Sequence, residues 1–238
     1  MKDLFFDLDH TLWDFEKNSR EALKEGYDLY SLNTKGIGDV SEYVFHYEKA
    51  NTWCWGEYQA GRMEKNELRW RRFSMALEYC GLDVNSDPEV KMLGEKLGKH
   101  YVETSPFMTH LVKDALEVVK ELKNRGHRLI ILTNGFEEVQ HIKVNRCGLE
   151  PFFEKVLTSD ALGIKKPNPG IFKLALHIVG SRVQDAVMLG DSLESDVMGA
   201  RDSGWGQVYY NPMGIPHNEA VLHEVKDLKS ILEIKLNK

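Results

Sequence analysis

Hydrophobic residues recur every three or four positions along residues 15–104, which is the spacing of amphipathic helices. Four segments carry this spacing and predict four helices: "NSREALKEGYDLYSL", "SEYVFHYEKANTWCWGEYQ", "KNELRWRRFSMALEYC" and "DPEVKMLGEKLGKHYVE". Breaks rich in glycine, asparagine and aspartate separate them. Before the last segment, Ser86 or Asp87 followed by Pro88 is typical of a helix N-terminus. We therefore expect an all-helical block in this part of the chain.

From about residue 107, short apolar runs alternate with amphipathic segments. The runs "HRLIILTNG", "FFEKVLTSD", "DAVMLGDS" and "GQVYYNP" predict strands, and the segments beside them, "ESDVMGARDSG" included, predict helices. This alternation is typical of a parallel sheet covered by helices on both faces. The N-terminal run "DLFFDLD" predicts one more strand. The expected fold is therefore α/β, a doubly wound parallel-sheet core of residues 1–14 and 105–238 with a helical insertion of residues 15–104.

Polar residues follow the predicted strands where each one ends. They are, in chain order, Asp7, Asp9, Thr133, Asn134, Lys166 and Asp191. In doubly wound sheets, ligands bind outside the carboxyl ends of the strands. Each motif alone has an ordinary structural explanation, such as a capping or turn residue at Asp9 and a turn at Asn134-Gly135. Their occurrence together, in order and at strand ends, favours a functional site.

Two aspartates as close as Asp7 and Asp9 raise each other's pKa unless a cation or a proton compensates their charge. With Asp191 they form an oxygen-rich set suited to Mg²⁺. Beside such a cation, one aspartate can attack phosphorus, and the other can move the proton of the leaving oxygen and of water. The Thr133 hydroxyl, the Asn134 amide and backbone N–H groups can hold phosphoryl oxygens. Lys166 can stabilise the negative charge at the nucleophile and phosphate.

Four motifs, "DLDHT", "LTNG", "KKPNPGIF" and "GDSLESD", resemble those of phosphatases of the haloacid dehalogenase (HAD) superfamily with a helical cap inserted after the first strand. The resemblance implies a HAD-like, Rossmannoid core, residues 15–104 as the cap, an aspartyl-phosphate intermediate and Mg²⁺. It assigns these roles: Asp7 as nucleophile and metal ligand, Asp9 as general acid/base with a carbonyl ligand to Mg²⁺, Thr133 and Lys166 as phosphate-binding residues, Asp191 as metal ligand, and Asp196 as a support of the metal site. True haloacid dehalogenases lack an acid at the position of Asp9, so Asp9 favours a phosphatase. His10 stands where many relatives carry glycine.

A looser resemblance, carried by "NTWCWGEYQAGRMEKNELRWRRF" and "GWGQVYYNPMG", is to cytosolic 5′-nucleotidases of this superfamily that act on pyrimidine and noncanonical nucleotides. It implies nucleoside 5′-monophosphates as substrates. The alternatives are a phosphatase of sugar phosphates or other small metabolites, a phosphomutase, and a catalytically silent phosphate-binding module. The tryptophans can stack on a nucleobase, but they are more often residues that fill the core of a small helical bundle. Of them, Trp13, beside the catalytic loop in the sequence, is the best placed to meet substrate.

Composition limits the binding partners and the location expected of the protein. It is 42% hydrophobic with a formal net charge of −6, which argues against charge-driven binding to nucleic acid or to membrane surfaces. The N-terminus lacks the features of a signal peptide, and no apolar stretch is long enough for a membrane helix. Cys54, Cys80 and Cys147 form no CxxC pair and are expected to be free thiols. We expect a cytoplasmic monomer or weak homodimer whose partner is a small phosphorylated metabolite.

Overall fold

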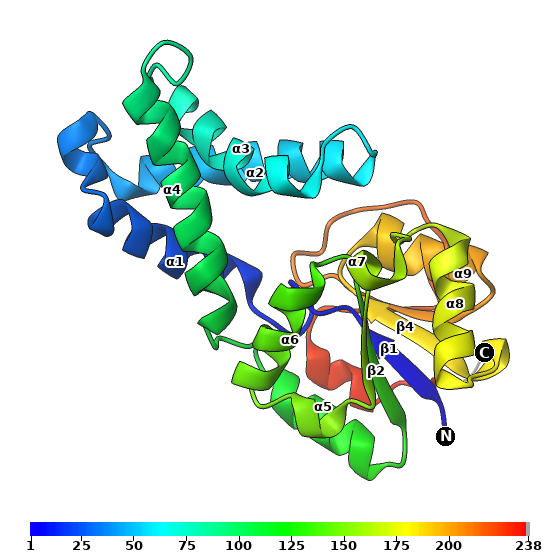
Figure 1. The fold of residues 1–238 in the computed structure, drawn as a ribbon. Coiled ribbons are helices and arrows are strands. Elements are labelled where there is room, and N and C mark those ends of the chain that lie inside the picture. Colours follow the sequence, from blue (N-terminus) through cyan, green and yellow to red (C-terminus); the bar gives the residue numbers. More distant parts are fainter. Residues whose placement is uncertain (237–238) are drawn as a thin grey trace. The chain divides into compact units, whose positions relative to one another are not determined.

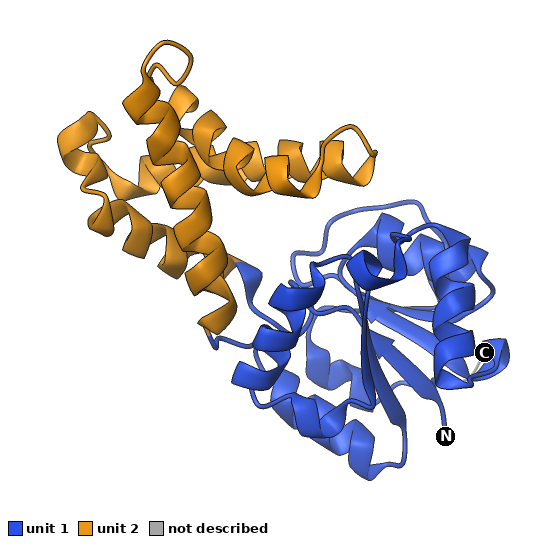
Figure 2. Ribbon diagram, in the orientation of Figure 1, with its two compact units in different colours: residues 1–15, 109–238 blue, residues 16–108 orange. Residues whose placement is uncertain are grey.

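The chain divides into two compact units in the computed structural model, which describes residues 1–236 (Figure 2). One unit comprises Met1–Phe15 and Thr109–Lys238, and the other comprises Glu16–Met108. Each unit has a hydrophobic core of its own. The chain therefore leaves the first unit once, shortly after its first strand, and returns to it once.

A six-stranded parallel sheet forms the centre of the first unit (Figure 1). Its strands lie in the order β3-β2-β1-β4-β5-β6. Their bounds are β1 Asp3–Phe6, β2 Arg128–Thr133, β3 Lys155–Thr158, β4 Ala186–Gly190, β5 Gly206–Tyr210 and β6 His223–Val225. Every residue of β1 is buried, as expected of a strand covered on both faces. The strand order reverses between β1 and β4, which is where doubly wound folds bind their ligands.

Helices cover both faces of this sheet. Their bounds are α5 Ala115–Asn124, α6 Glu137–Arg146, α7 Ser159–Leu162, α8 Pro169–Val179 and α9 Gly199–Asp202. Aromatic packing holds α8 against one face, where the Trp205 ring lies 4.5 Å from the Phe5 ring and 5.2 Å from the Phe172 ring, between centroids. Helix α5 lies on the opposite face (Figure 1). The buried strands are thus shielded from water on both sides.

Two local features differ from the sequence predictions. The segment after β4, expected to be one helix, forms a π-helix over Leu193–Met198 that continues into α9. Strand β6 was not predicted, because its three residues carry no apolar run. It forms by pairing with β5, in a register that places Val225 opposite Tyr210. Backbone pairing at the sheet edge, rather than its own side-chain pattern, makes this segment a strand.

Four helices form most of the second unit, in agreement with the periodicity of its sequence. Their bounds are α1 Phe15–Leu29, α2 Val40–Gln59, α3 Lys65–Tyr79 and α4 Pro88–Thr104. Tyr43, Tyr47 and Phe73 are among the largest fully buried side chains of their shared core. Asp87 is the N-cap of α4, as expected, since its carboxylate accepts the Glu89 N–H at 2.8 Å.

The two stretches of chain that connect the units are hydrogen-bonded to each other inside the first unit. The Val112 N–H donates to the Leu12 carbonyl at 2.9 Å, and the Asp14 N–H donates to the His110 carbonyl at 3.0 Å. His10, just before them, has a left-handed backbone with a φ of 63°. The loop that follows β1 therefore runs directly into these paired connections.

None of the helices within residues 1–236 combines the length and the apolar character required to cross a membrane. Cys54, Cys80 and Cys147 are free thiols, as expected. Burial raises the pKa of each of the three thiols to about 11. They are therefore protonated near neutral pH and poor nucleophiles.

Candidate active site

Three carboxylates gather beyond the carboxyl ends of β1 and β4. Asp7 follows β1, Asp191 follows β4, and Asp196 lies in the π-helix that comes next. One oxygen from each of these side chains lies within 4.8 Å of the other two. Thr11 orients Asp191, since its hydroxyl donates to Asp191 Oδ1 at 2.9 Å and accepts the Asp191 N–H at 3.1 Å. Hard oxygen donors gathered in this way fit a cation such as Mg²⁺.

Gly190 makes room for Asp196. A Cβ at position 190 would lie 2.1 Å from Asp196 Oδ2, so a larger residue would displace the carboxylate. Asp196 is 1% exposed, and its Oδ2 accepts the Ser192 N–H at 3.1 Å. The glycine of "GDSLESD" therefore permits a close approach of a side chain to the backbone.

Lys166 is buried between two of these carboxylates. Its Nζ donates to Asp7 Oδ1 at 2.7 Å, to Asp196 Oδ1 at 2.6 Å and to the Leu132 carbonyl at 2.7 Å. These contacts use all three N–H donors of the ammonium group. Burial alone would lower the pKa of Lys166, but the charges of Asp196 and Asp7 outweigh it and hold the pKa above its usual range. Lys166 is therefore charged at any pH at which the enzyme would work.

The carboxyl groups of this cluster resist ionisation. Burial raises the pKa of Asp7 from 3.8 to about 7, although Lys166 acts in the opposite direction. Burial and the charge of Asp7 raise the pKa of Asp191 to about 6. Burial also raises the pKa of Asp196. One lysine thus does not neutralise three carboxylates, two of them buried and one half-buried, and a divalent cation would supply the missing positive charge.

Asn134 has both ends of its side-chain amide on the backbone of Lys166. Its Oδ1 accepts the Lys166 N–H at 2.8 Å, and its Nδ2 donates to the Lys166 carbonyl at 2.9 Å. This contact joins the loop after β2 to the loop that carries the lysine. Asn134 therefore positions Lys166 in the structure, and the expectation that its amide holds phosphoryl oxygens stays a prediction.

Thr133 ends β2 and is 1% exposed. Its Oγ1 accepts a hydrogen bond from Gln140 Nε2 at 2.9 Å and from the Gly135 N–H at 3.2 Å. Because the hydroxyl oxygen is the acceptor in both contacts, the hydroxyl hydrogen remains available for donation. A phosphoryl oxygen is a suitable acceptor for it.

Asp9 directs its carboxylate away from the other three acids and towards α6. Asp9 Oδ1 lies 2.5 Å from Lys143 Nζ, and Asp9 Oδ2 accepts from Gln140 Nε2 at 2.8 Å. Burial alone would raise the pKa of Asp9, but the charge and hydrogen bond of Lys143, helped by Gln140, hold it below its ordinary value. The pKa of Asp9 is thus shifted in the opposite direction to the pKa values of Asp7, Asp191 and Asp196, and Asp9 is ionised near neutral pH.

Trp13 lies beneath this ion pair. Lys143 Nζ is 3.9 Å from the centroid of the Trp13 ring, a cation–π contact. The indole is 1% exposed. Trp13 is therefore a buried packing residue, the alternative that the sequence favoured for each tryptophan, and its ring is not exposed to substrate in this structure.

Sequence reasoning missed three residues that touch the predicted site: Thr11, Gln140 and Lys143. Thr11 stands inside the "DLDHT" motif, so its closeness to Asp7 was a usable signal. Gln140 and Lys143 are three residues apart and share one face of α6. Polar residues at that spacing are ordinary on a surface helix, and only the tertiary structure reveals that both are buried.

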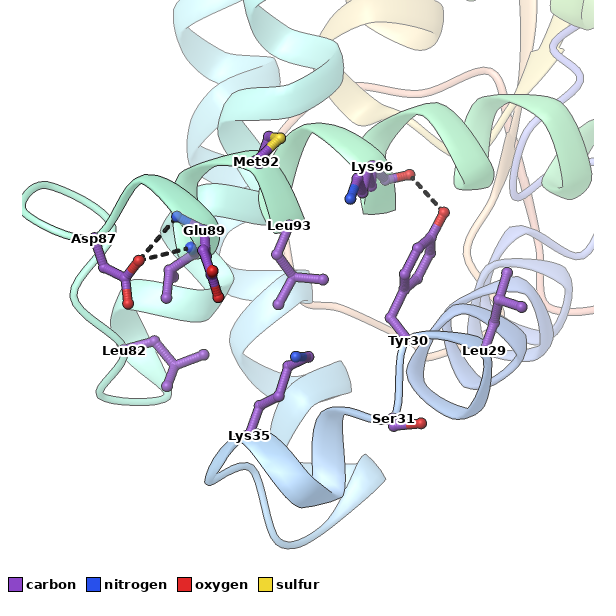
Figure 3. Close-up of a pocket in the computed structure, with 11 residues that line it drawn as sticks. Leu29, Tyr30, Ser31, Lys35, Leu82, Asp87, Glu89, Met92, Leu93 and Lys96 are labelled. Atoms are coloured by element: carbon purple, nitrogen blue, oxygen red, sulfur yellow. Dashed lines mark hydrogen bonds between the residues drawn. The ribbon is translucent and has the colours of Figure 1, made fainter.

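The second unit contains a hollow of about 740 Å³ (Figure 3). It is lined by the end of α1, the start of α4 and the loops beside them, with Tyr30, Lys35 and Leu93 among its lining residues. No predicted catalytic, phosphate-binding or metal-binding residue lines this hollow.

Comparison with known proteins identifies the family of this chain. Residues 1–204 match the family model of haloacid dehalogenase-like hydrolases. Pyrimidine 5′-nucleotidase PynA of Streptococcus pneumoniae is 28% identical over 235 residues, which cover 98% of this chain and 94% of that protein. Glyceraldehyde 3-phosphate phosphatase of Pyrococcus furiosus is 34% identical over 239 residues, which cover 98% of this chain and 92% of that protein.

Among solved structures, the HAD-hydrolase YfnB of Bacillus subtilis, crystallised with magnesium, has the same fold. It superposes with a TM-score of 0.83 at 23% sequence identity, covering 98% of this chain and 97% of that one.

Proposed function

Since the chain belongs to the haloacid dehalogenase-like hydrolases and is a phosphomonoesterase of that family, we propose that it hydrolyses nucleoside 5′-monophosphates. The observation that carries the chemistry is the placement of Lys166 between Asp7 and Asp196 at the end of β1. The similarity to a pyrimidine 5′-nucleotidase over nearly the whole chain supports the choice of substrate. In this proposal the first unit is the catalytic core, and the second unit is the cap that selects the leaving group.

Asp7 is the proposed nucleophile. Its Oδ1 is held by Lys166, while its Oδ2 accepts no hydrogen bond from any residue within 1–236. Oδ2 can therefore attack phosphorus, forming an aspartyl-phosphate as the bond from phosphorus to the leaving oxygen breaks. Lys166 stabilises negative charge at the nucleophile, and Thr133 donates its hydroxyl hydrogen to a phosphoryl oxygen. Asn134 holds the Lys166 backbone in place for this step.

Asp9 is the proposed general acid/base. Because Lys143 holds the pKa of Asp9 low, Asp9 must take up a proton from solvent before it can protonate the leaving oxygen in the first step. In the second step it takes a proton from water, when that water attacks the phosphorus of the aspartyl-phosphate. Its position two residues after Asp7 keeps it at the same strand end without placing it in the carboxylate cluster. The two aspartates can therefore carry different charges at the same pH.

Mg²⁺ is the proposed cofactor, held by Asp7, Asp191 and the Asp9 carbonyl, with Asp196 beside them. The close approach of the Asp7, Asp191 and Asp196 oxygens and the high pKa of Asp7 support this assignment. When bound, the cation would neutralise the charge of the carboxylates and of the incoming phosphate. Asp196, which accepts from Lys166, would hold the lysine at the edge of the metal site.

A sugar-phosphate or triose-phosphate substrate is the second candidate. The 34% identity to a glyceraldehyde 3-phosphate phosphatase, over 98% of the chain, favours it. The same core residues serve both reactions, since the phosphoryl group and its transfer are identical and only the leaving alcohol differs.

A substrate panel with and without a chelator tests the proposal. We expect kcat/KM for pyrimidine nucleoside 5′-monophosphates to exceed that for glyceraldehyde 3-phosphate and other sugar phosphates, and EDTA to abolish both activities. Higher kcat/KM for the sugar phosphates would favour the second candidate. Activity that survives removal of divalent cations would contradict the assigned metal site.

Replacement of the nucleophile tests the covalent mechanism. Asp7→Asn retains size and shape but removes the attacking carboxylate, so turnover should fall by at least about 10⁴-fold. Asp202→Asn, an exposed aspartate on α9, is the matched control and should keep wild-type rates. Residual activity above about 1% in Asp7→Asn would exclude Asp7 as the nucleophile.

A further inference from the structure

Lys143 has Asp9 as its one ion-pair partner within the described residues 1–236. It lies on α6 and is 4% exposed, and a buried ammonium group is unfavourable unless it is paired. The ion pair with the Asp9 carboxylate therefore stabilises Lys143 in this buried position. Resting on the proposed function, we infer that Lys143, together with Gln140, is a positioning residue that holds Asp9 in the orientation needed for proton transfer.

Both oxygens of the Asp9 carboxylate are engaged. Lys143 Nζ contacts Oδ1 at 2.5 Å, and Gln140 Nε2 contacts Oδ2 at 2.8 Å. Two contacts on different oxygens fix the rotation of the carboxylate as well as its position. A single ion pair would leave that rotation free.

Gln140 also connects Asp9 to the loop after β2, which begins at Thr133 and is proposed to bind phosphate. The same Nε2 that donates to Asp9 Oδ2 donates to Thr133 Oγ1 at 2.9 Å. The backbone of that loop is shaped for this side chain, because a Cβ at Gly135 would lie 2.1 Å from Gln140 Nε2. The orientation of the acid is thus set relative to the residue proposed to hold the phosphoryl group.

Trp13 fixes the other side of Lys143. The ring lies 3.9 Å from Lys143 Nζ, and its backbone carbonyl accepts the His10 N–H at 3.0 Å. Trp13 belongs to the loop that begins at Asp9, so the lysine contacts that loop at two points. Lys143 consequently ties the Asp9 side chain and the loop that carries it to α6.

The proposed reaction needs this orientation in both steps. In the first, Asp9, which is ionised in the free site, takes up a proton from solvent before the chemical step. The bond from phosphorus to the leaving oxygen then breaks as Asp7 Oδ2 bonds to phosphorus, and the leaving oxygen takes that proton from Asp9. In the second, the ionised Asp9 takes a proton from the attacking water, and Asp7 is released with inorganic phosphate. A misplacement of about 1 Å can cost about 100-fold in rate.

A comparison of two esters tests the inference. The sugar oxygen of uridine 5′-monophosphate must be protonated to leave, whereas p-nitrophenolate leaves without a proton. Lys143→Met should lower kcat/KM for the nucleotide about 10- to 100-fold and kcat/KM for p-nitrophenyl phosphate less than about 3-fold. Lys173→Met, an exposed lysine on α8, is the matched control and should leave both values unchanged.

A double mutant distinguishes a role of Lys143 in positioning Asp9 from a merely structural role of Lys143. Asp9→Asn removes the group through which Lys143 acts, so adding Lys143→Met to it should change kcat/KM for either ester less than about 2-fold. Lys143→Arg, which keeps the charge, should restore part of the nucleotide rate. Gly135→Ala, which crowds Gln140 and leaves Lys143 intact, should reproduce the selective loss, and thermal unfolding checks the fold of every variant.

Equal losses on the two esters, no loss on either, or a further loss in the Asp9→Asn background would overturn the inference. The proposed function fails by different results. These are a wild-type enzyme that hydrolyses neither ester with Mg²⁺, or an Asp7→Asn variant that retains turnover. Wild-type hydrolysis of both esters combined with a non-selective Lys143→Met variant would reject the role of Lys143 alone.

Discussion

Lys166 is the residue on which the electrostatics of the carboxylate cluster depend. Its ammonium group bridges Asp7 and Asp196, and both carboxyl groups already have raised pKa values in its presence. Without Lys166, the two acids would face each other in a buried site, and no other positively charged side chain within residues 1–236 forms an ion pair with either of them. Protonation of Asp7 would then compete directly with its action as a nucleophile.

Removal of this charge is expected to abolish most of the activity. Lys166→Met should lower kcat at least about 100-fold near neutral pH, because the variant loses charge stabilisation and ionised Asp7 together. Lys165→Met is the matched control, since it removes a lysine from the adjacent position, and it should retain at least about a third of the wild-type kcat. Steady-state kinetics with saturating Mg²⁺ measure both. The opposite pattern would assign the phosphate-binding role to Lys165.

The sequence predicts those site residues that directly follow a strand. Asp7 and Asp191 were identified because each directly follows an apolar strand, and parallel strands bring such positions to one edge. The partner of each polar group could not be predicted in this way. The pairing of Asp9 with Lys143 and the contact of Asn134 with the Lys166 backbone depend on how α6 and a distant loop pack.

At the scale of elements, the close packing of α3 against α4 depends on two glycines four residues apart. A Cβ at Gly98 would lie 2.6 Å from the Arg69 carbonyl oxygen and 3.1 Å from the Trp70 Cα. A Cβ at Gly94 would lie 2.5 Å from Ser74 Oγ. Because the neighbours of Gly98 are backbone atoms, they cannot rotate away, and the two helices would have to separate.

Alanine substitutions at two helical glycines should therefore have opposite effects. Gly98→Ala should destabilise the protein by about 1–3 kcal/mol through this overlap. Gly56→Ala, on α2, meets no atom within 4 Å and should stabilise it by up to about 1 kcal/mol, since alanine favours the helix. Urea unfolding followed by helical circular dichroism measures both. Destabilisation by Gly56→Ala, or its absence in Gly98→Ala, would contradict the packing described here.

Elements with a strong periodic pattern were predictable, and those shaped by their neighbours were not. The helices of the second unit carry apolar residues at three- and four-residue spacing, and strands β1 to β5 are short apolar runs that alternate with amphipathic segments. Strand β6 and the π-helix Leu193–Met198 lack such a repeat. The first depends on the edge of β5, and the second accompanies the placement of Asp196 against Gly190.

At the scale of the whole molecule, the buried acids link folding, pH and metal binding. The pKa values of Asp7 and Asp191, about 7 and about 6, exceed the ordinary value of 3.8. A carboxyl group with a raised folded-state pKa contributes stability below its unfolded-state pKa and loses that contribution as pH rises through the folded-state value. Without a cation, these two groups therefore destabilise the fold progressively between about pH 4 and about pH 7.

Mg²⁺ should reverse this loss because it binds the ionised carboxylates. We expect excess MgCl₂ to raise the unfolding temperature by about 3–8 °C near pH 8 and by much less near pH 5.5, where protons compete for the same oxygens. Differential scanning fluorimetry measures the shift, and Asp191→Asn should reduce it at the higher pH. A shift of the same size at both pH values, or none, would contradict a metal site built from these acids.

The hydrogen bonds between the two connecting stretches also determine whether the segment 16–108 can be deleted or exchanged. The Asp14 N–H and the His110 carbonyl lie 3.0 Å apart, so the ends of the segment 16–108 are adjacent in space. A short turn can therefore replace the whole segment without removing a strand of the sheet. We expect such a deletion to leave a folded domain, and segments of other lengths to be accepted at the same point. New leaving-group preferences could then be acquired by exchange of the insertion, with Asp7, Asp9 and Lys166 unchanged.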